Sequence, residues 1–342
     1  MVKFKNDIKI CIVKLSAMGD IIHAMGALQF IKKQYPSCSI DWIVESGFKS
    51  VLEGNPHIDN ILPINLKSIK KNKSEIFNQI KILKSYGKNN YDIVIDAQGL
   101  LKSAIVSKIV GKKFKNSFIS GFSKESIREG IASWFYDRHT NISYSANTID
   151  RNIKVLCEPL DIKVSSEQII NKEKFLFSNS IIKNMPEVYN LFVIGSTWES
   201  RNYPKEKFVE LANKLKMPTY IICGSEDEEI KAIWMSTRSE YLEVLPRGSL
   251  NDLKKVIENC NILIGNDTGP THMAWGLNKP SVTIFGPTPI NRVYITPINK
   301  VVKSSTIINH QKLDKNDFSI CEIEVDEIME QVNKIKDNCD SK

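Results

Sequence analysis

Three segments of this 342-residue chain combine residue types that bind anions or move protons. Each begins where a run of apolar residues ends and a helical pattern follows: residues 14–23 (KLSAMGDIIH), 195–204 (GSTWESRNYP) and 265–272 (GNDTGPTH). Backbone N–H groups at the start of a helix have no partner inside the helix, and the helix dipole favours negative charge there. The three segments are therefore candidates for ligand binding.

The first segment places Asp20 at or near the expected N-cap of a helix. A carboxylate at this position satisfies free N–H groups and stabilises a helix by about 0.5–2 kcal/mol. At the mouth of a substrate cleft the same carboxylate would act as a general base. The residue pattern leaves both interpretations open.

The other two segments favour binding of a phosphate group. Ser196 and Thr197 offer hydroxyl and amide donors, and Arg201 could hold phosphate oxygens bidentately. In the third segment, helix N–H groups and the hydroxyls of Thr268 and Thr271 suit a diphosphate. Each turn alone is also typical of a surface loop or a helix cap, but two of them after strands favour a nucleotide diphosphate.

Several other chemistries lack their motifs in this chain. There is no GxGxxG after a strand, no GxxxxGK[ST] and no HExxH. The absence of these motifs argues against a dehydrogenase, a P-loop NTPase and a zincin metalloprotease. The five histidines have no metal-ligand spacing, and there is no DxD sequence. We therefore predict no metal and no cofactor.

The elements that must position the three segments alternate between strands and helices. Short apolar runs without strict alternation are typical of parallel strands buried on both faces, and they occur at 8–13, 40–44, 93–95, 191–194, 220–223, 262–264 and 282–285. Helical spacing occurs at 21–31, 76–83, 208–215, 253–257, 272–277 and 325–335. This order predicts α/β architecture with doubly wound sheets.

The chain length favours two domains over one, at about 100–200 residues each. We predict that the polar stretch 165–189 contains the linker between the domains. The predicted domains are then residues 1–170 and 185–342, and the second ends in a helix. Open α/β sheets bind ligands beyond the carboxyl ends of their strands. Two facing sheets are therefore expected to enclose a cleft.

Composition indicates an ordinary globular protein, with 42% hydrophobic and 25% charged residues. No run of 18 apolar residues occurs, and the N-terminus does not resemble a signal peptide. The seven cysteines are odd in number and form no CxxC pair, which argues against disulfide and zinc frameworks. We predict a cytoplasmic location.

Positive charge is concentrated in the first half of the chain. Residues 1–170 hold 25 Lys and Arg against 16 Asp and Glu, whereas residues 171–342 hold 22 against 23. Lysines crowd 67–88 and 102–115, which could be solvated helix faces or a surface for nucleic acid, an anionic membrane or an acidic substrate. No nucleic-acid-binding motif accompanies them, and we predict no nucleic-acid partner.

Seven motifs together resemble the lipopolysaccharide heptosyltransferases, family 9 of the glycosyltransferases. They are KLSAMGDIIHAMGAL, DWIVESGF, DAQGLLKSA, the ST-x₃-R-x-YP segment, CGSEDEE, NDTGPTHMA and FGPT, in the family's order over residues 8–288. DWIVESGF, DAQGLLKSA and SWFYDR resemble most the heptosyltransferase I branch, which acts on the first Kdo of lipid A.

The resemblance implies a GT-B fold, in which two facing Rossmann-like domains hold the acceptor (first domain) and the nucleotide sugar (second domain). It implies inverting, metal-independent transfer of heptose from ADP-L-glycero-β-D-manno-heptose to Kdo-lipid A. An acceptor embedded in a membrane gives the basic first domain a role. We expect a protein peripheral on the anionic cytoplasmic face of the inner membrane, held by contacts that weaken with salt.

The resemblance also implies roles for single residues. Asp20 falls on the catalytic aspartate, and Glu228 on the acidic residue that holds the ribose. The implied donor site further contains Ser196, Thr197, Arg201, Asp267, Thr268, Gly269 and His272, and the implied acceptor site contains Lys102, Arg128 and Arg151. The family commonly has lysine where this chain has Arg201, which keeps the charge but changes the donor geometry.

Three other functions remain as alternatives. The branch that adds heptose to the first heptose differs only in its acceptor. A nucleotide-sugar 2-epimerase of GT-B-like fold would need no acceptor. A two-lobed sugar-binding protein would bind without turnover, but such proteins are usually exported and this sequence shows no signal peptide.

Overall fold

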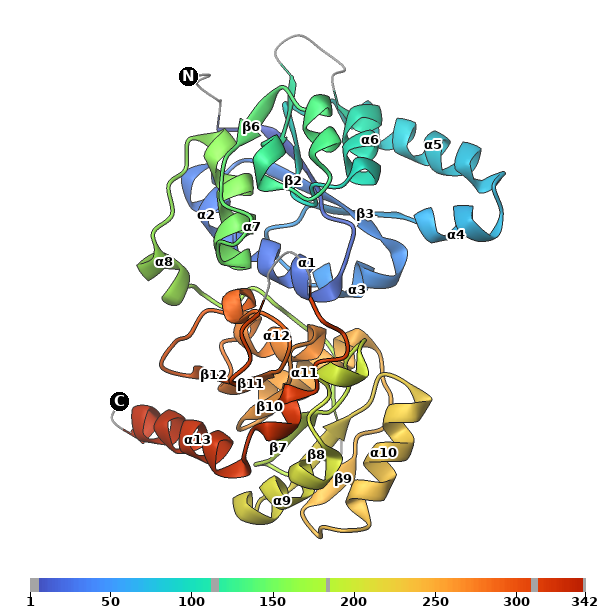
Figure 1. Cartoon of the computed structure of the whole chain (residues 1–342). Helices are drawn as coiled ribbons and strands as arrows, with labels where there is room; N and C mark the ends of the chain where they lie inside the picture. Colours follow the sequence, from blue (N-terminus) through green and yellow to red (C-terminus); the bar gives the residue numbers. More distant parts are fainter. Residues whose placement is uncertain (1–5, 112–116, 183–184, 309–312, 341–342) are drawn as a thin grey trace. The chain divides into compact units, whose positions relative to one another are not determined.

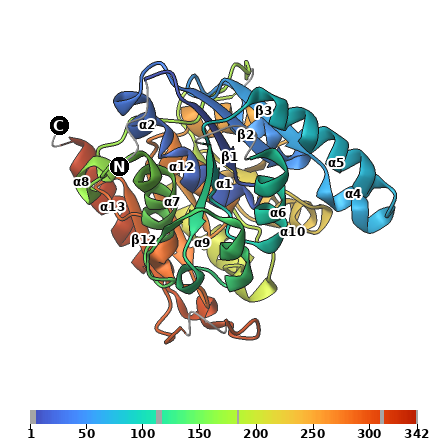
Figure 2. The same cartoon turned by 90° about the horizontal axis from the view of Figure 1, so that it is seen from above.

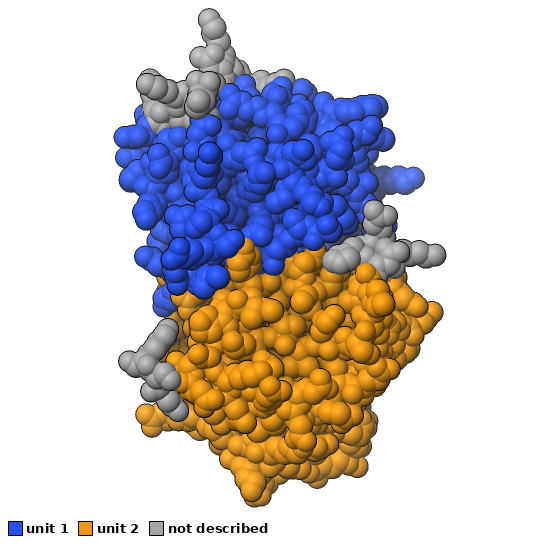
Figure 3. All heavy atoms as spheres, turned by 60° about the vertical axis from the view of Figure 1, so that its left-hand side comes forward, with its two compact units in different colours: residues 1–175 blue, residues 176–342 orange. Residues whose placement is uncertain are grey.

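The structure is a computed structural model that describes residues 6–111, 117–182, 185–308 and 313–340. The chain divides into two compact units, residues 1–175 and 176–342 (Figure 3). This division falls within the polar stretch 165–189. Lys112, Lys113 and Lys115 of the basic stretch lie outside the described residues.

The first unit is built on a six-stranded parallel sheet (Figure 1). Its strands are β1 (Lys9–Val13), β2 (Ser39–Glu45), β3 (Asn60–Ile64), β4 (Ile93–Asp96), β5 (Phe118–Phe122) and β6 (Arg138–Thr140). They lie in the order β3-β2-β1-β4-β5-β6, and the direction of the chain across the sheet reverses between β1 and β4. This is the strand order of a Rossmann fold.

Helices cover both faces of this sheet, because right-handed crossovers in opposite directions place their helices on opposite faces. Helices α1 (Met18–Met25) and α3 (Lys49–Leu52) pack together on one face with α7 (Thr148–Cys157). Helices α5 (Glu75–Tyr86) and α6 (Leu101–Val110) pack side by side on the other face, with the 3₁₀ segment η4 (Gly130–Phe135) beside α6 (Figure 2). The remaining helices of the unit are α2 (Leu28–Gln34), α4 (Leu66–Lys71) and α8 (Ser166–Ile170).

The second unit repeats this arrangement. Its strands β7 (Asn190–Val193), β8 (Thr219–Ile222), β9 (Leu242–Val244), β10 (Leu263–Asn266), β11 (Ser281–Phe285) and β12 (Asn299–Lys303) lie in the order β12-β11-β10-β7-β8-β9. All neighbouring strands are parallel, and the order reverses between β7 and β10. Its helices are α9 (Lys205–Leu215), α10 (Glu226–Ser236), α11 (Leu250–Asn259), α12 (Gly269–Gly276) and α13 (Val325–Asp340).

The predicted fold class, two doubly wound Rossmann-like units, is confirmed, and each of the seven predicted strands is present. Strands β3, β5, β6, β9 and β12 were not predicted. Apart from β5, which contains Gly121, these strands lie at or near sheet edges, where polar residues or a proline break the apolar run.

The single helix predicted at 21–31 is wrong, because the structure has two helices there, α1 and α2. The break falls at the MGA sequence, where Gly26 ends α1 and Ala27 precedes α2. Glycine lowers the propensity to continue a helix. No helix in the described ranges has the length and apolar character needed to cross a membrane.

Gly121 of β5 tests the packing of the first sheet. A Cβ at this position would lie 2.4 Å from the ring of Tyr136, whose hydroxyl donates a 2.7 Å hydrogen bond to the buried Asp96. We expect Gly121→Ala to lower the free energy of unfolding by about 1–3 kcal/mol, measured by urea denaturation. The control is Gly47→Ala, where a Cβ meets nothing within 4 Å. An equal loss of unfolding free energy in both variants would contradict the steric clash with Tyr136 as the cause.

Candidate functional site

The reversal of strand order fixes where each unit can bind a ligand. In open α/β sheets the loops after the two strands at the reversal separate and leave a crevice at their carboxyl ends. The segment with Asp20 follows β1, beside the loop after β4. The segments with Arg201 and Asp267 follow β7 and β10, which are paired neighbours. The three sequence segments thus lie at the two expected places.

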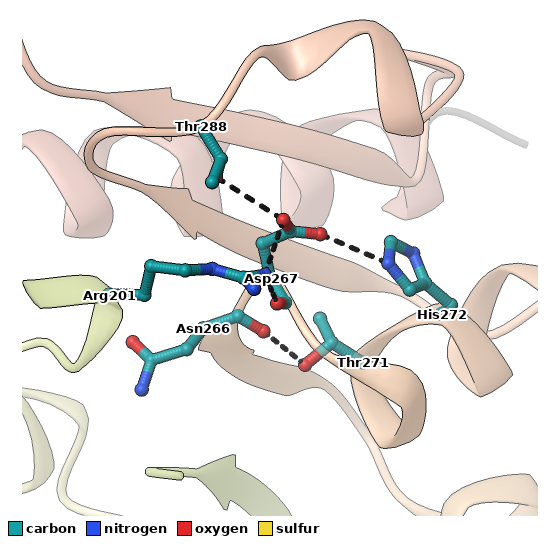
Figure 4. A network of polar contacts seen from close by, with 6 residues as sticks. All are labelled: Arg201, Asn266, Asp267, Thr271, His272 and Thr288. Carbon is teal, nitrogen blue, oxygen red and sulfur yellow. Dashed lines mark hydrogen bonds and ion pairs between the residues drawn. The ribbon is translucent and has the colours of Figure 1, made fainter. Parts of the chain in front are cut away.

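A buried asparagine joins the two loops of the second unit. Asn266 donates from Nδ2 to the carbonyl of Ile194 at 2.7 Å, and its Oδ1 accepts from the N–H of Tyr203 at 3.1 Å. The hydroxyl of Thr271 donates to the carbonyl of Asn266 at 2.7 Å (Figure 4). The Thr271 hydroxyl, which we expected to donate to an anion, instead fixes the turn. Asn266 therefore sets the separation of the two loops.

Asp267 is the centre of a polar network at the end of β10 (Figure 4). Its carboxylate contacts His272 Nε2 at 3.0 Å, Arg201 Nη2 at 2.6 Å and Thr288 Oγ1 at 3.2 Å. Arg201 Nη2 also donates to the Asp267 carbonyl. Burial acts to raise the pKa of Asp267, but His272 and the charges of Arg292 and Arg201 outweigh it and hold the pKa well below its usual range.

Four buried polar atoms in the loop after β7 have no hydrogen-bond partner among the described residues. They are Ser196 Oγ, Ser200 Oγ, Arg201 Nε and Asn202 Oδ1. Buried polar groups in proteins are almost always satisfied, so a cluster of unsatisfied ones makes this loop a candidate ligand position. Arg201 contacts Asp267 through Nη2, which leaves its Nε without a hydrogen bond, and Thr197 is exposed on the same loop.

Glu228 is fixed against the backbone at the end of β7. It lies in the first turn of α10, where its Oε2 accepts from the N–H of Gly224 at 2.7 Å and its own N–H donates to Ser225 at 3.2 Å. A Cβ on Gly195 would lie 2.0 Å from the Glu228 carboxyl carbon. Only glycine at position 195 leaves room for this carboxylate, which presents a fixed acceptor for hydroxyl groups.

The start of α12 adds backbone donors to the same edge. Thr268 is the N-cap residue and Gly269 the first residue of the helix, and the Thr268 side chain makes no capping hydrogen bond. The backbone N–H groups of Gly269 and Thr271 belong to this first turn, whereas Pro270 has none. The second unit therefore brings together Ser196, Thr197, Arg201, Glu228, Asp267, Thr268, Gly269 and His272 at the carboxyl ends of β7, β8 and β10.

Two loops of the first unit are joined in a similar way. Gln98, after β4, accepts at Oε1 from the N–H groups of Leu15 at 3.0 Å and Ser16 at 3.1 Å. Lys14 is buried and donates from Nζ to the carbonyl of Ala97 at 2.8 Å. Burial lowers the pKa of Lys14, Asp20 and Asp96 act to raise it, and Arg151 lowers it further. The charge of Asp20 therefore acts on the buried Lys14.

Asp20 is not the N-cap residue. The cap position belongs to Ala17, and Asp20 is the third residue of α1, where its Oδ2 accepts from the N–H of Ala17 at 3.3 Å. The side chain is half-buried, and this long hydrogen bond leaves its other oxygen available. The position combines a weak contact at the helix start with a half-buried carboxylate oxygen that this contact does not use.

The three expected acceptor cations lie around the segment 126–129. Arg151 donates to the carbonyls of Ser126 at 2.6 Å and Ser143 at 2.7 Å, and its guanidinium lies over the rings of Phe122 and Tyr144. Burial lowers its pKa. Lys102 is exposed in the first turn of α6, whose N-terminal N–H at Leu101 is bonded to Glu129 at 2.8 Å. Arg128 is exposed on the segment itself.

Sequence reasoning missed several residues that shape these sites, namely Lys14, Glu45, Gln98, Asn266, Thr288 and Arg292. For Lys14 a signal was present, because a lysine inside the apolar run CIVKL must be buried with a partner. Glu45 ends β2 inside the quoted DWIVESGF motif; burial raises its pKa, and Lys102 and Lys67 oppose this rise. Gln98 and Arg292 carry no local signal. Within the described ranges, no cluster of three or more His, Cys, Asp or Glu could hold a metal ion.

The Asp267 network predicts a pH-dependent stability. A carboxylate with a lowered folded pKa stabilises the fold above its unfolded pKa of about 3.9, and loses that contribution as pH falls toward the folded pKa. We expect Asp267→Asn to cost about 3 kcal/mol at pH 7, because it leaves Arg201 and His272 without their anion. The cost should shrink below pH ~4, as measured by urea unfolding at several pH values.

The matched control is Asp326→Asn, which removes an exposed carboxylate paired with Lys214 at 2.7 Å. Exposed ion pairs contribute about 0–1 kcal/mol, so this variant should unfold like the wild type. A cost at Asp267 that stays constant from pH 7 to pH 3 would contradict the network described above.

Comparison with known proteins gives a consistent result over almost the whole chain. The family model for glycosyltransferase family 9 (heptosyltransferase) matches residues 79–321. Lipopolysaccharide heptosyltransferase 1 of Campylobacter coli is 35% identical, covering 96% of this chain and 98% of that protein. The protein of the same name from Escherichia coli K12 is 27% identical over 82% of this chain and 88% of its own length.

A solved structure supports the fold. The structure described as E. coli heptosyltransferase WaaC with ADP superposes with a TM-score of 0.80 over 96% of this chain and 100% of that chain, at 23% identity. At this identity the likeness concerns the fold, which agrees with the predicted GT-B class and its two Rossmann-like units.

Proposed function

We propose a specific transfer reaction on the premise that this chain belongs to glycosyltransferase family 9, the heptosyltransferases. The protein moves heptose from ADP-heptose to the first Kdo of lipid A in the synthesis of the lipopolysaccharide inner core. The 35% identity to a lipopolysaccharide heptosyltransferase 1 over nearly the full length of both chains carries this proposal. The sites at β1/β4 and β7/β10 have the chemistry that the reaction requires.

The second unit supplies the groups for the ADP portion of the donor. Arg201 Nε, Ser196 Oγ and the N–H groups at the start of α12 would hold the diphosphate. Their positive potential would stabilise the charge that grows on the leaving diphosphate, at roughly 2.7–4 kcal/mol for each well-placed donor. The Glu228 carboxylate would accept from ribose hydroxyls. Asp267 keeps Arg201 and His272 in place for these contacts.

The first unit supplies the base. Inversion by a single displacement needs a group that removes the proton of the acceptor hydroxyl as the heptose carbon is attacked. Asp20 carries a half-buried carboxylate, one oxygen of which is not used by the Ala17 contact. Asp20 accepts the proton, the Kdo oxygen forms the new glycosidic bond, and ADP leaves with the bonding electrons.

The acceptor contributes negative charge, and the first unit carries cations without carboxylate partners to meet it. Arg151 is fixed by two carbonyls, so its positive charge would be available to the carboxylate of Kdo, and the buried Lys14 would add to the positive potential. Lys102 and Arg128 extend this positive rim. We further propose that the protein works in the cytoplasm, attached peripherally to the anionic inner-membrane surface where this acceptor is embedded.

The first experiment measures ADP release from ADP-heptose by the purified protein with Kdo-bearing lipid A. We expect release that depends on this acceptor. If ADP is released only with an acceptor that already carries the first heptose, the protein instead catalyses the transfer of the second heptose. Release of ADP or a free sugar without any acceptor would favour an epimerase.

Asp20 variants separate the base from the helix contact. Asp20→Asn keeps an oxygen for the Ala17 N–H but cannot take a proton, whereas Asp20→Ala removes both. We expect both variants to lose transfer by about 10²–10⁴-fold while binding ADP normally in calorimetry. Only Asp20→Ala should lower the melting temperature. Full activity of Asp20→Asn would exclude Asp20 as the base.

Glu228 and its neighbour form a matched pair for the donor site. Glu228→Gln keeps an acceptor for the Gly224 N–H but weakens any bond to ribose hydroxyls, because hydrogen bonds to charged groups are worth about 1.5–3 kcal/mol. We expect ADP to bind roughly tenfold more weakly. Glu229→Gln, whose carboxylate faces Arg247 at 3.0 Å, should bind ADP like the wild type. Equal affinities in the two variants would remove Glu228 from the site.

A further inference from the structure

Exposed apolar side chains of the first unit gather on one layer of the fold. Among its described residues eight large hydrophobic side chains are exposed, and six of them lie on α5, α6 and η4, the layer that covers one face of the sheet. These six are Ile76, Phe77, Leu101, Ile105, Ile131 and Trp134. Phe77 and Trp134 are each 76% exposed, which is unusual for aromatic residues in a soluble surface. We call this layer the α5–α6 face (Figures 1 and 2).

The same face carries a positive charge. Exposed lysines on α5 and α6 are Lys81, Lys84, Lys102 and Lys108, and Glu75 is the acidic residue of the two helices. Helical spacing sets Phe77 in line with Lys81 and Lys84, and Leu101 in line with Ile105 and Lys108. Lysines interleaved with apolar and aromatic side chains are typical of helices that lie in the interface of an anionic bilayer.

Two of the three elements begin near the carboxyl edge of the sheet. Helix α6 comes directly after β4 and η4 comes after β5, and each runs back toward the start of the next strand, so its first residues lie near the carboxyl ends, whereas α5 follows α4. Ile76, Phe77 and Leu101 are in the first turns of α5 and α6, and Ile131 is the second residue of η4. Lys102, an acceptor-site candidate, belongs to the same first turn of α6.

From this placement we infer that the α5–α6 face docks the protein on an anionic phospholipid bilayer, with Phe77, Ile105 and Trp134 in the interface and Lys81 and Lys84 against lipid phosphates. The inference rests on the proposed function, because the lipid acceptor of that function is what makes docking on a membrane useful. A bilayer is favoured over a protein partner because the exposed apolar residues are dispersed among exposed lysines. Docking would bring the carboxyl edge of the first sheet to the depth of the acceptor headgroup.

The test is co-sedimentation with vesicles of phosphatidylcholine containing or lacking phosphatidylglycerol. Two exposed lysines should each contribute about fivefold to binding, so Lys81→Gln/Lys84→Gln should bind anionic vesicles roughly 25-fold more weakly. Phe77→Ser/Ile105→Ser should bind roughly tenfold more weakly through the loss of apolar burial. All four side chains are exposed, so the variants should melt like the wild type.

Matched controls are available elsewhere on the chain. Lys33→Gln/Lys49→Gln removes two exposed lysines from α2 and α3, outside the α5–α6 face, and Ile230→Ser/Ile233→Ser removes two exposed isoleucines from α10. Both controls should sediment with vesicles like the wild type. Equal losses in control and test variants would overturn the inference, because the effect would then follow net charge or hydrophobicity alone.

Quenching by lipids brominated in the acyl chain locates the contact. Trp134 is one of five tryptophans, and we expect the quenching seen with the wild type to be lost in Trp134→Phe. Quenching that persists in this variant would place another surface in the bilayer. Concentration-dependent self-association that the Phe77→Ser/Ile105→Ser change abolishes, without vesicle binding by the wild type, would assign the face to a second copy and overturn the inference.

Heptose transfer to a deacylated, soluble Kdo acceptor separates this inference from the proposed function. Face variants should retain wild-type rates with that acceptor and lose activity only with lipid A in vesicles. If the wild type transfers nothing to either acceptor, the proposed function fails, whereas the sedimentation and quenching results still decide the membrane contact.

Discussion

A buried carboxylate at the end of β10 is the constraint on which the proposed donor site of the second unit depends. Asp267 is 2% exposed and is held there by a guanidinium, an imidazole and a hydroxyl. A buried charge of this kind is tolerated only when it is paired and hydrogen-bonded. The same contacts fix the positions of the Arg201 and His272 side chains, so this buried carboxylate sets the geometry of the proposed diphosphate site.

The first unit uses the opposite charge in the corresponding place. Lys14 is buried at the end of β1, held by a carbonyl of the loop after β4, with Asp20 nearby. In both units a side chain amide, Gln98 or Asn266, joins the two loops at the reversal of strand order. The two units therefore join their loops in the same way, but the buried charged residue beside the loops is positive in the first unit (Lys14) and negative in the second (Asp267). A cationic centre suits an acidic acceptor, and a network with free donors suits a diphosphate.

Arginine at position 201, where the resembled family commonly has lysine, has a physical explanation in this network. One guanidinium contacts both the carboxylate and the main-chain carbonyl of Asp267 through Nη2 and still keeps Nε without a partner. A lysine at this position would offer a single ammonium group on a flexible side chain. It lacks the several fixed N–H groups with which an arginine can bind an internal carboxylate and a ligand at the same time. The substitution thus adds a structural contact at a position whose charge is retained.

The sequence by itself determined the local parts of this protein: seven buried strands, the candidate ligand-binding turns after three of them, and the excess of positive charge in the first half. These properties depend on short-range patterns of apolar, small and charged residues, which a single segment contains. Asp20 was found in this way because it lies in a recognisable turn. Its exact position in the helix, the third residue of α1, was not predicted. The edge strands were missed because their patterns are short and polar.

Only the tertiary structure decided which segments meet. Lys14 contacts Ala97 across 83 residues of sequence, and Arg201 contacts Asp267 across 66. These contacts follow from β4 lying beside β1 and β10 beside β7, and that order is set by the packing of whole sheets and helices. No local pattern encodes it, because the side chains that recognise each other are brought together only when the crossovers between distant strands have formed.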